Sequence, residues 1–185
     1  MKRASSPPAW PRTASMQGGV KYHIRPIRSD DAERESAFIM SLSPESRFQR
    51  LMYTLREPSA EFVARLVNID QHRDMALVAV QGEGAAEKII GVARYAADTD
   101  GRDCEFAVAV ADEWQCRGIG TTLIKLLFEH AASEGFRTIY GTVFANNQRM
   151  LDLARWLGLT VEEPVAGQAT VRASLRLDQI ARRLG

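Results

Sequence analysis

Residues 104–120 read Cys-Glu-Phe-Ala-Val-Ala-Val-Ala-Asp-Glu-Trp-Gln-Cys-Arg-Gly-Ile-Gly, and this stretch decides the fold. Its first half, 104–110, is short, apolar and alternating, which predicts a β-strand. From Gly118 to about Gly135 the apolar residues recur at helical spacing, and 138–144 is β-branched and aromatic. The segment is therefore predicted to form a strand, a helix and a second strand, with the two strands as parallel neighbours.

The remaining chain supplies further strands and helices on both sides of this unit. Helix-start chemistry appears at Ser29-Asp30-Asp31, at Ser43-Pro44-Glu45 and at Pro58-Ser59. The other segments are predicted from their periodicity: strands over 22–28, 75–80, 89–97, around Val161 and over 170–177, and a helix over 147–157. This order predicts a mixed α/β layer protein whose central sheet has about six or seven strands flanked by helices.

The domain organisation follows from length and local composition. At roughly 150 residues per domain, 185 residues predict one domain, which we place at 21–177. Residues 1–20 contain Lys and Arg but no acid, together with three prolines and only one strong hydrophobe, Trp10, so we expect a loose, basic leader. The last residues, 178–185, are expected to form a C-terminal tail.

Composition excludes several classes of protein. The formal net charge of +1 gives no global field that would attract nucleic acid or a membrane surface, so neither partner is expected. No apolar run approaches the 18 residues that a membrane span needs. Cys104 and Cys116 are too few for a disulfide framework, and the spacing of Cys and His indicates no metal site. We therefore expect a cytoplasmic protein without a metal.

The glycines at the start of the predicted helix indicate an anion site. Gly118 and Gly120 carry no side chains, so backbone N–H groups can approach an anion, and the helix adds its positive dipole end. Arg117 is placed to meet a phosphate. A Walker loop would need Gly-Lys-Ser/Thr, and a dinucleotide loop would need a third glycine and an acid after the next strand, none of which is present. The alternative is a tight turn that needs glycine for its shape alone.

A known family has the same motifs. Gln115-x-x-Gly118-x-Gly120, preceded by the strand 106–110 and by Trp114, resembles the acetyl-CoA pyrophosphate loop of the GNAT N-acetyltransferase superfamily. The run Asn147-x-x-Met150, followed by Gly158-Leu159, is similar to that family's Asn-bearing helix. The resemblance implies a GNAT-like α/β fold, acetyl-CoA as acyl donor, a primary amine as acceptor and no metal.

The resemblance also assigns roles to residues of the loop and its surroundings. It implies that backbone groups of Val108 and Val110 bind the pantetheine arm, that amides from Cys116 to Thr121 hold the pyrophosphate, and that Asn147 reaches the pantetheine. The residues expected to bind the coenzyme are Val108, Val110, Gln115, Cys116, Arg117, Gly118, Ile119, Gly120, Thr121 and Asn147. Cys116 faces phosphate in this arrangement, and family members generally transfer by direct attack, so we expect no covalent role for its thiol.

A lysine acceptor sets a demand for a general base. A lysine amine with a pKa of about 10.4 is neutral only about once in 2,500 at pH 7, a penalty of about 4.6 kcal/mol. Glu105 is the candidate base, because strand alternation places it with Ala107 and Ala109, whose small side chains leave room for a substrate. Its Glu-Phe-Ala-Val context and the run 43–48 resemble the bacterial protein-lysine acetyltransferase (Pat-like) branch, whose glutamate serves as base. The alternative is an ordinary solvent-facing glutamate.

One departure from the family leaves alternatives open. Many relatives place a tyrosine seven residues after the motif Asn to protonate the leaving thiolate, and here that position is Ala154. The thiolate then leaves without a protein acid, or Tyr140 or a water serves. A protein lysine is the preferred acceptor. The open alternatives are a small amine such as a polyamine, amino acid or aminoglycoside, a non-catalytic acyl-CoA-binding sensor, and a nucleic-acid-associated factor that uses the leader. Relatives often join subunits through strands near the carboxyl end, so a homodimer is expected.

Overall fold

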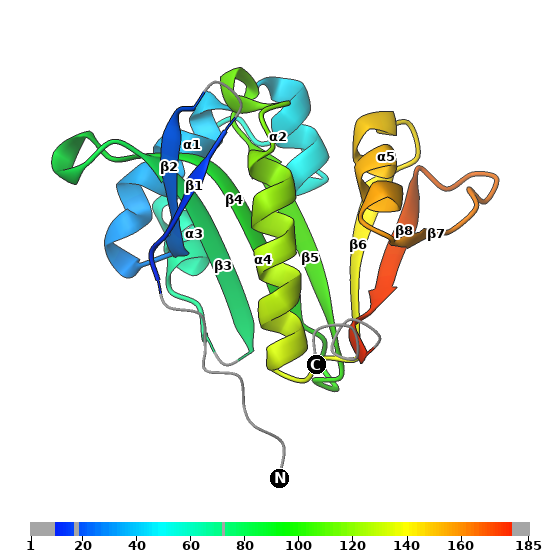
Figure 1. Cartoon of the computed structure of the whole chain (residues 1–185). Coiled ribbons are helices and arrows are strands. Elements are labelled where there is room, and N and C mark those ends of the chain that lie inside the picture. Colours follow the sequence, from blue (N-terminus) through cyan, green and yellow to red (C-terminus); the bar gives the residue numbers. More distant parts are fainter. Residues whose placement is uncertain (1–9, 17–18, 72, 179–185) are drawn as a thin grey trace, which may run out of the picture. The chain divides into compact units, whose positions relative to one another are not determined.

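The computed structural model describes residues 10–16, 19–71 and 73–178 (Figure 1). Across these residues, eight strands are hydrogen-bonded in the order β1-β2-β3-β4-β5-β6-β8-β7. The strands are β1 (Arg12–Ser15), β2 (Lys21–Pro26), β3 (Asp74–Gln81), β4 (Lys88–Ala97), β5 (Asp103–Val110), β6 (Thr138–Phe144), β7 (Thr160–Val161) and β8 (Thr170–Arg176). The helices are α1 (Ala32–Ser41), α2 (Pro44–Leu51), α3 (Ala60–Val67), α4 (Ile119–Ser133) and α5 (Gln148–Trp156), with the short 3-10 helices η1 (Ser29–Asp31), η2 (Gly84–Ala86) and η3 (Asp112–Trp114). The predicted mixed α/β architecture is confirmed.

The chain divides into two compact units, and β4, β5 and α4 contribute to both. Among the described residues, the N-terminal unit comprises those from Trp10 to Arg94 and Val108–Leu127. The C-terminal unit comprises Tyr95–Ala107 and the residues from Phe128 to Asp178. The glycine loop that begins α4 therefore belongs to the N-terminal unit, and Glu105 belongs to the C-terminal unit.

Two of the three helix starts predicted in the N-terminal unit show the expected cap, whereas α1 follows Asp31, whose side chain makes no cap hydrogen bond. The Ser43 hydroxyl accepts a hydrogen bond from the Ser46 N–H, and Pro44 is the first residue of α2. The Ser59 hydroxyl likewise caps α3. Helix α2 ends at Leu51, where Met52 adopts a left-handed conformation with a φ of 63°.

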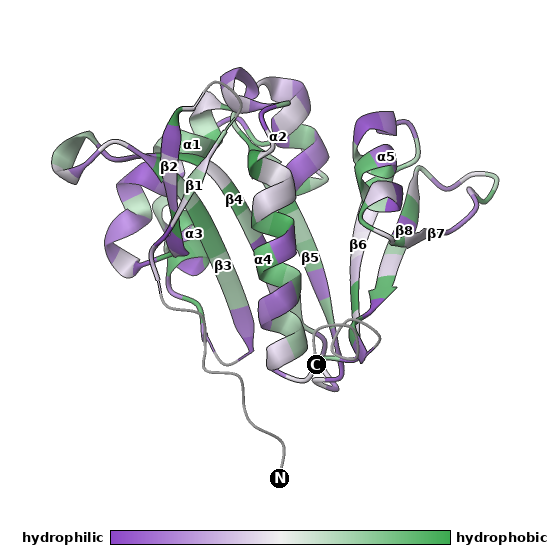
Figure 2. Cartoon of the chain, in the orientation of Figure 1, coloured by the Kyte–Doolittle hydropathy of each residue, from purple (hydrophilic) through white to green (hydrophobic). Residues whose placement is uncertain are grey.

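The core of the N-terminal unit is built on β3, which is hydrophobic between its two polar end residues (Figure 2). Ala76, Val78 and Val80 pack in one buried cluster with residues of α1 and α3. Helix α4 approaches β4 closely at Gly91, where an added Cβ would lie 3.1 Å from Leu123 Cδ1. Burial of these faces holds β4 and the start of α4 together, which fixes the root of the glycine loop.

A buried ion-pair network ties β2 to η1 in the same unit. Both Asp31 carboxylate oxygens accept from the Arg25 guanidinium, at 2.7 and 2.8 Å, and Asp31 is completely buried. The backbone N–H of Arg28 donates to the same carboxylate at 2.9 Å. Arg25 also contacts Glu87 at 2.5 Å and is only 4% exposed. The two buried charges are thus paired in the bidentate geometry that makes such pairs strong.

The C-terminal unit confirms the predicted parallel pair of strands. Strand β5 pairs with β6 in parallel from Asp103↔Thr138 to Glu105↔Tyr140, and β6 pairs with β8 in antiparallel along its length. Phe106 packs so closely on β6 that a Cβ on Gly141 would lie 2.9 Å from its ring, which explains the glycine at that position. His130 on α4 hydrogen-bonds the buried Tyr95 hydroxyl through Nδ1 at 2.9 Å. The His130 ring thus lies against Tyr95 within the C-terminal unit, with its centre 6.0 Å from that of the Tyr95 ring.

The N-terminus differs from the expectation of a loose leader up to residue 20. Residues 12–15 form β1 and pair with β2 from Arg12↔Ile24 to Ser15↔Lys21. Arg-Thr-Ala-Ser contains no large apolar side chain, so its sequence has no alternation of apolar and polar residues that would predict a strand. The strand forms because β2 offers an edge with free hydrogen-bonding groups. This strand accounts for a sheet larger than the six or seven strands expected. Residues 1–9, 17–18 and the tail from 179 lie outside the described residues.

None of the helices in the described part of the chain has the length and apolar character that crossing a bilayer requires.

Candidate active site

The loop between β5 and α4 has a backbone shape that a glycine-rich sequence permits. Gly118 has a φ of 86° and Cys116 a φ of 60°, both in the left-handed region. A Cβ added to Gly118 would meet nothing within 4 Å, so this glycine is needed for its backbone conformation and not for space. A non-glycine residue is disfavoured in that region, and Cys116 holds it because the surrounding structure fixes the turn.

The first turn of α4 presents N–H groups at this loop. Helix α4 begins at Ile119, and the Thr122 N–H donates to the Gly118 carbonyl at 3.0 Å. The N–H groups of residues 119–121 precede this bond and have no acceptor one turn back in the helix. The first turn contains no acidic residue that would compete for the positive end of the helix. The loop therefore offers the chemistry of an anion site.

Two predicted coenzyme residues in this loop make contacts within the protein. The Gln115 side-chain amide donates to the Val110 carbonyl at 3.1 Å and to the Ser46 hydroxyl at 3.3 Å. The Arg117 guanidinium lies 5.1 Å from the centre of the Trp114 ring, in a cation–π contact. These contacts hold the loop, and Arg117 stays exposed next to the N–H groups.

The predicted pantetheine contacts lie on β5 and at the start of α5. Val108 and Val110 are half-buried on β5, beyond the stretch registered against β6, which ends at Glu105. Asn147 is the N-cap of α5, where its Oδ1 accepts from the Met150 N–H at 3.1 Å. The spacing of Asn147-x-x-Met150 thus has a helix-capping cause in this chain. Their roles toward a coenzyme stay predictions.

Glu105 lies on an exposed face of the C-terminal unit. Its neighbours Cys104 and Phe106 are buried, so the predicted alternation is confirmed over 104–106, whereas residues 107–110 are all half-buried. The Glu105 Oε1 accepts from the Thr142 hydroxyl at 2.7 Å, which holds the carboxylate over β6. Sequence reasoning did not select Thr142. The parallel register Glu105↔Tyr140 is the signal that could have found it, because Thr142 follows Tyr140 on the same face of β6.

The sequence profile of the acetyltransferase (GNAT) family matches residues 37–159, which include the loop, Glu105 and Asn147. The chain belongs to the acetyltransferase (GNAT) family. This membership confirms the predicted GNAT fold and the enzyme class, an acyl-CoA-dependent N-acetyltransferase. Members of the family use acetyl-CoA as acyl donor and act on amine acceptors.

Several relatives support the predicted similarity to the Pat-like branch. Acetyltransferase PA5475 of Pseudomonas aeruginosa is 38% identical over 144 residues, which cover 78% of this chain and 77% of that protein. Acetyltransferase Pat of Mycolicibacterium smegmatis is 27% identical over 80% of this chain, but the match covers only 44% of that protein. The crystal structure of the GNAT domain of S. lividans PAT superposes with a TM-score of 0.80 at 25% identity, covering 90% of this chain and 97% of that chain.

The GNAT position that often holds a tyrosine offers no acid here. Ala154 on α5 is completely buried, so the position serves packing. Tyr140, the alternative acid, donates its hydroxyl to Asp98 Oδ1 at 2.9 Å. Burial and this hydrogen bond to Asp98 raise the pKa of Tyr140 to about 12. A phenol with that pKa whose proton is held by a carboxylate is a weak proton donor.

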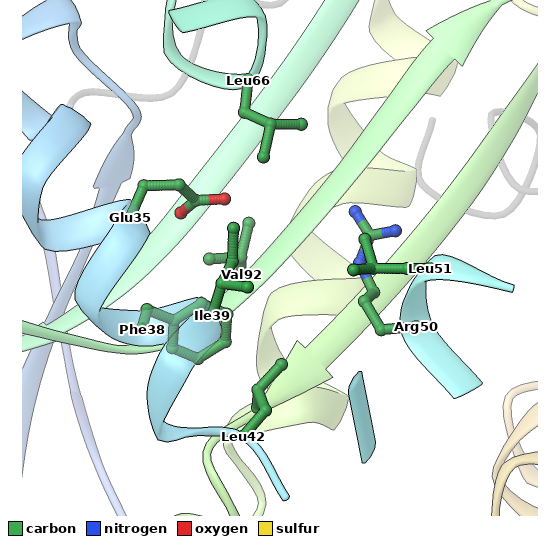
Figure 3. A pocket seen from close by; sticks show the side chains of 8 residues that line it. All are labelled: Glu35, Phe38, Ile39, Leu42, Arg50, Leu51, Leu66 and Val92. Carbon is green, nitrogen blue, oxygen red and sulfur yellow. The ribbon is translucent and has the colours of Figure 1, made fainter. Parts of the chain in front are cut away.

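A cavity in the N-terminal unit of this GNAT protein lies apart from the glycine loop. Figure 3 shows the carboxylate of Glu35 and the side chain of Arg50 among apolar side chains from α1, α2, α3 and β4. Glu35 is 3% exposed; its Oε1 accepts from Arg94 at 3.2 Å, and its Oε2 has no partner among the described residues. Burial raises the pKa of Glu35. The cavity measures about 20 Å³, room for about one water, so it is too small for an acyl acceptor.

Within residues 10–16, 19–71 and 73–178, no three His, Cys, Asp or Glu side chains gather as metal ligands would.

Proposed function

We propose that this GNAT protein transfers the acetyl group of acetyl-CoA to a primary amine, and that its preferred acceptor is a protein lysine. The observation that carries the donor side is the loop before α4, with left-handed Cys116 and Gly118 and an acid-free first turn. The acceptor preference is supported by the similarity to proteins named Pat and by the exposed carboxylate of Glu105.

On the donor side, the backbone carries the binding. N–H groups from Cys116 to Thr121 hold the pyrophosphate, since the loop is exposed over 116–118 and α4 adds its dipole. Arg117 adds a charge beside them. Main-chain groups of Val108 and Val110 bind the pantetheine as an added strand would. Asn147, the N-cap of α5, reaches the pantetheine.

On the acceptor side, Glu105 acts as general base in a direct attack. It accepts a proton from the amine as the nitrogen forms its bond to the acetyl carbon, and the bond from that carbon to sulfur breaks with release of the coenzyme thiolate. Thr142 orients the carboxylate. The thiolate leaves without a protein acid, since Ala154 is buried and the Tyr140 proton is held by Asp98.

A small-amine acetyltransferase is the alternative function, because it would use the same donor loop and the same base. Calorimetric titration with acetyl-CoA, followed by thiol release with lysine peptides and small amines, distinguishes the two functions. Turnover on peptides supports our proposal, and turnover on small amines alone supports the alternative. Absence of acetyl-CoA binding, or binding without turnover on either class of amine, contradicts both.

Gly118→Ala is expected to weaken acetyl-CoA binding by about tenfold. An alanine in the left-handed region costs about 1–2 kcal/mol, which the loop relieves by leaving the conformation that presents its N–H groups. The dissociation constant measured by calorimetry reports this loss.

Gly84→Ala is the matched control for this variant. Gly84 also has a positive φ, 57°, and open space around its Cβ position, but it lies in η2. The two variants should lose similar stability, and only Gly118→Ala should weaken binding. Equal affinities in the two variants would contradict the proposed donor site.

Acetyl-CoA is expected to protect Cys116 from thiol reagents. Cys116 is exposed in the loop, whereas Cys104 is buried, and burial raises the pKa of Cys104 to about 12. A native sample should therefore react at one thiol, slowly when acetyl-CoA is present, and at two thiols after unfolding. Peptide mapping, with Cys116→Ser to assign the label, measures the effect. Protection of Cys104 alone, or equal rates at Cys116 with and without acetyl-CoA, would argue against this loop.

A further inference from the structure

The carboxylate of Asp112 binds the first turn of α2. It accepts from the Ser43 N–H at 2.9 Å, from the Ser43 hydroxyl at 2.9 Å and from the Ser46 hydroxyl at 2.8 Å. Asp112 is the first residue of η3, which follows β5 and precedes the glycine loop. Sixty-nine residues of sequence separate Asp112 from Ser43. The start of α2 and the approach to the loop are therefore held together by one side chain.

Gln115 adds a second connection between the same two segments. Its side-chain amide donates to the Ser46 hydroxyl at 3.3 Å and to the Val110 carbonyl at 3.1 Å. The Ser46 hydroxyl thus contacts both Asp112 and Gln115. These bonds form a network from the end of β5 through α2 to the residue before Cys116, all within the N-terminal unit.

The shape of the loop gives this network a purpose. Cys116 is a non-glycine residue in the left-handed region, directly after Gln115. Such a conformation persists only where neighbouring contacts determine it. The neighbouring contacts include those of Gln115 and Asp112 to α2, so α2 serves as the support on which the loop is built.

The charge of Asp112 would by itself weaken the binding of an anion at the loop. A carboxylate close to an anion site repels a diphosphate, so its removal should by Coulomb's law strengthen binding. Hydrogen bonds that hold Asp112 to Ser43 and Ser46 lower its pKa against the effect of burial, which keeps the charge in place. Direct contact with an anionic ligand therefore does not explain a carboxylate at position 112.

We propose that Asp112 is a positioning residue that fixes the coenzyme loop to the first turn of α2. The proposal rests on the function proposed above, because it takes acetyl-CoA as the ligand of the loop. It has a thermodynamic consequence. Since α2 holds the loop in its binding shape, acetyl-CoA bound at the loop must stabilise the start of α2 in return.

Asp112→Asn is the main test, with Glu113→Gln as its matched control. Both variants remove one negative charge at adjacent exposed positions, but the Glu113 carboxylate accepts from the neighbouring Trp114 indole N–H at 3.0 Å, whereas Asp112 holds α2. We expect Asp112→Asn to weaken acetyl-CoA binding about tenfold and Glu113→Gln to leave it unchanged or slightly stronger, both measured by calorimetry. Equal or stronger binding by Asp112→Asn would overturn the proposal.

Hydrogen exchange of the complete protein separates this proposal from the function on which it rests. Without ligand, Asp112→Asn should speed exchange in both 44–51 and 111–121, and Glu113→Gln should change neither. With ligand, acetyl-CoA should slow exchange at the start of α2 in the wild type and not in Asp112→Asn. If the wild type binds no acetyl-CoA, the proposed function fails, and the ligand-free exchange still decides whether Asp112 joins the two segments. Unchanged exchange in 111–121 overturns the positioning role.

Ser46→Ala distinguishes a connected network from a local effect on the helix cap. It removes the hydroxyl that Asp112 and Gln115 share but leaves the Ser43 cap in place. We expect a smaller loss of acetyl-CoA affinity than for Asp112→Asn, and the double variant should lose less than the product of the two single losses. If the affinity loss of the double variant equals the product of the two single losses, Asp112 does not act through Ser46.

Discussion

Glu105→Gln is expected to lower kcat for a lysine acceptor by about 10²- to 10⁴-fold, because an amide cannot accept the proton of the attacking amine. Acetyl-CoA affinity should stay at the wild-type value, since the donor site is built from the backbone of the loop. The substitution keeps an oxygen that can accept the hydrogen bond from Thr142, so the side chain keeps its position. Initial rates of thiol release and a calorimetric titration measure the two quantities.

The pH dependence gives this prediction a second readout. The neutral fraction of a lysine with a pKa of about 10.4 rises about tenfold per pH unit below that value. The deficit of Glu105→Gln should therefore shrink as the pH rises from 7 to 9. Asp103→Asn is the control, because it makes the same chemical change two residues earlier on β5. Wild-type turnover by Glu105→Gln would mean that Glu105 is an ordinary solvent-facing residue.

Asp31→Ala should lower the free energy of unfolding by about 3–5 kcal/mol, the usual cost of breaking a buried pair by removing one partner. Arg25 is 4% exposed and would keep its contacts with Glu87 and the Pro26 carbonyl but lose both bonds to Asp31. Chemical denaturation at pH 7 measures the loss. Asp30→Ala is the control, because Asp30 is the exposed neighbour in the same turn, and its stability should stay within about 0.5 kcal/mol of the wild type.

The sign of the pH dependence follows from the direction of the shift. Burial raises the pKa of Asp31, but the hydrogen bonds from Arg25 and the Arg28 N–H outweigh burial, and the pKa lies below its usual value near 3.8. The stabilisation by Asp31 is therefore fully present above that value and is lost as the pH falls through the lowered pKa. The difference between wild type and Asp31→Ala should persist at pH 5 and shrink only in stronger acid. A constant difference at all pH values would exclude the charge as its cause.

Local chemistry predicted much of the fold. Strand, helix and strand were assigned over 104–144 from periodicity, and β5, α4 and β6 follow that assignment with a parallel register. Ser43 and Ser59 were identified as helix caps because a hydroxyl before a helix has a partner only a few residues away. The glycine loop was found for the same reason, since its backbone conformation is encoded in the residues that adopt it.

Contacts between distant segments could not be predicted in this way. Strand β1 has no apolar alternation and exists because β2 offers an edge. Thr142 reaches Glu105, and Tyr140 reaches Asp98, only through the pairing of separate strands. A hydroxyl or carboxylate has many partners within its chemical range, and sequence spacing does not choose among them.

The sequence by itself determined the glycine loop, the order of the elements and the face of β5 that carries Glu105. Each of these depends on steric and hydrophobic preferences that act over a few residues. Tertiary structure decided which side chains support these groups. Asp112 meets α2, Thr142 meets Glu105 and Asp31 meets Arg25 only after the chain has folded. Hydrogen bonds and ion pairs are short-ranged and directional, so their partners are fixed by the packing that brings distant segments into contact.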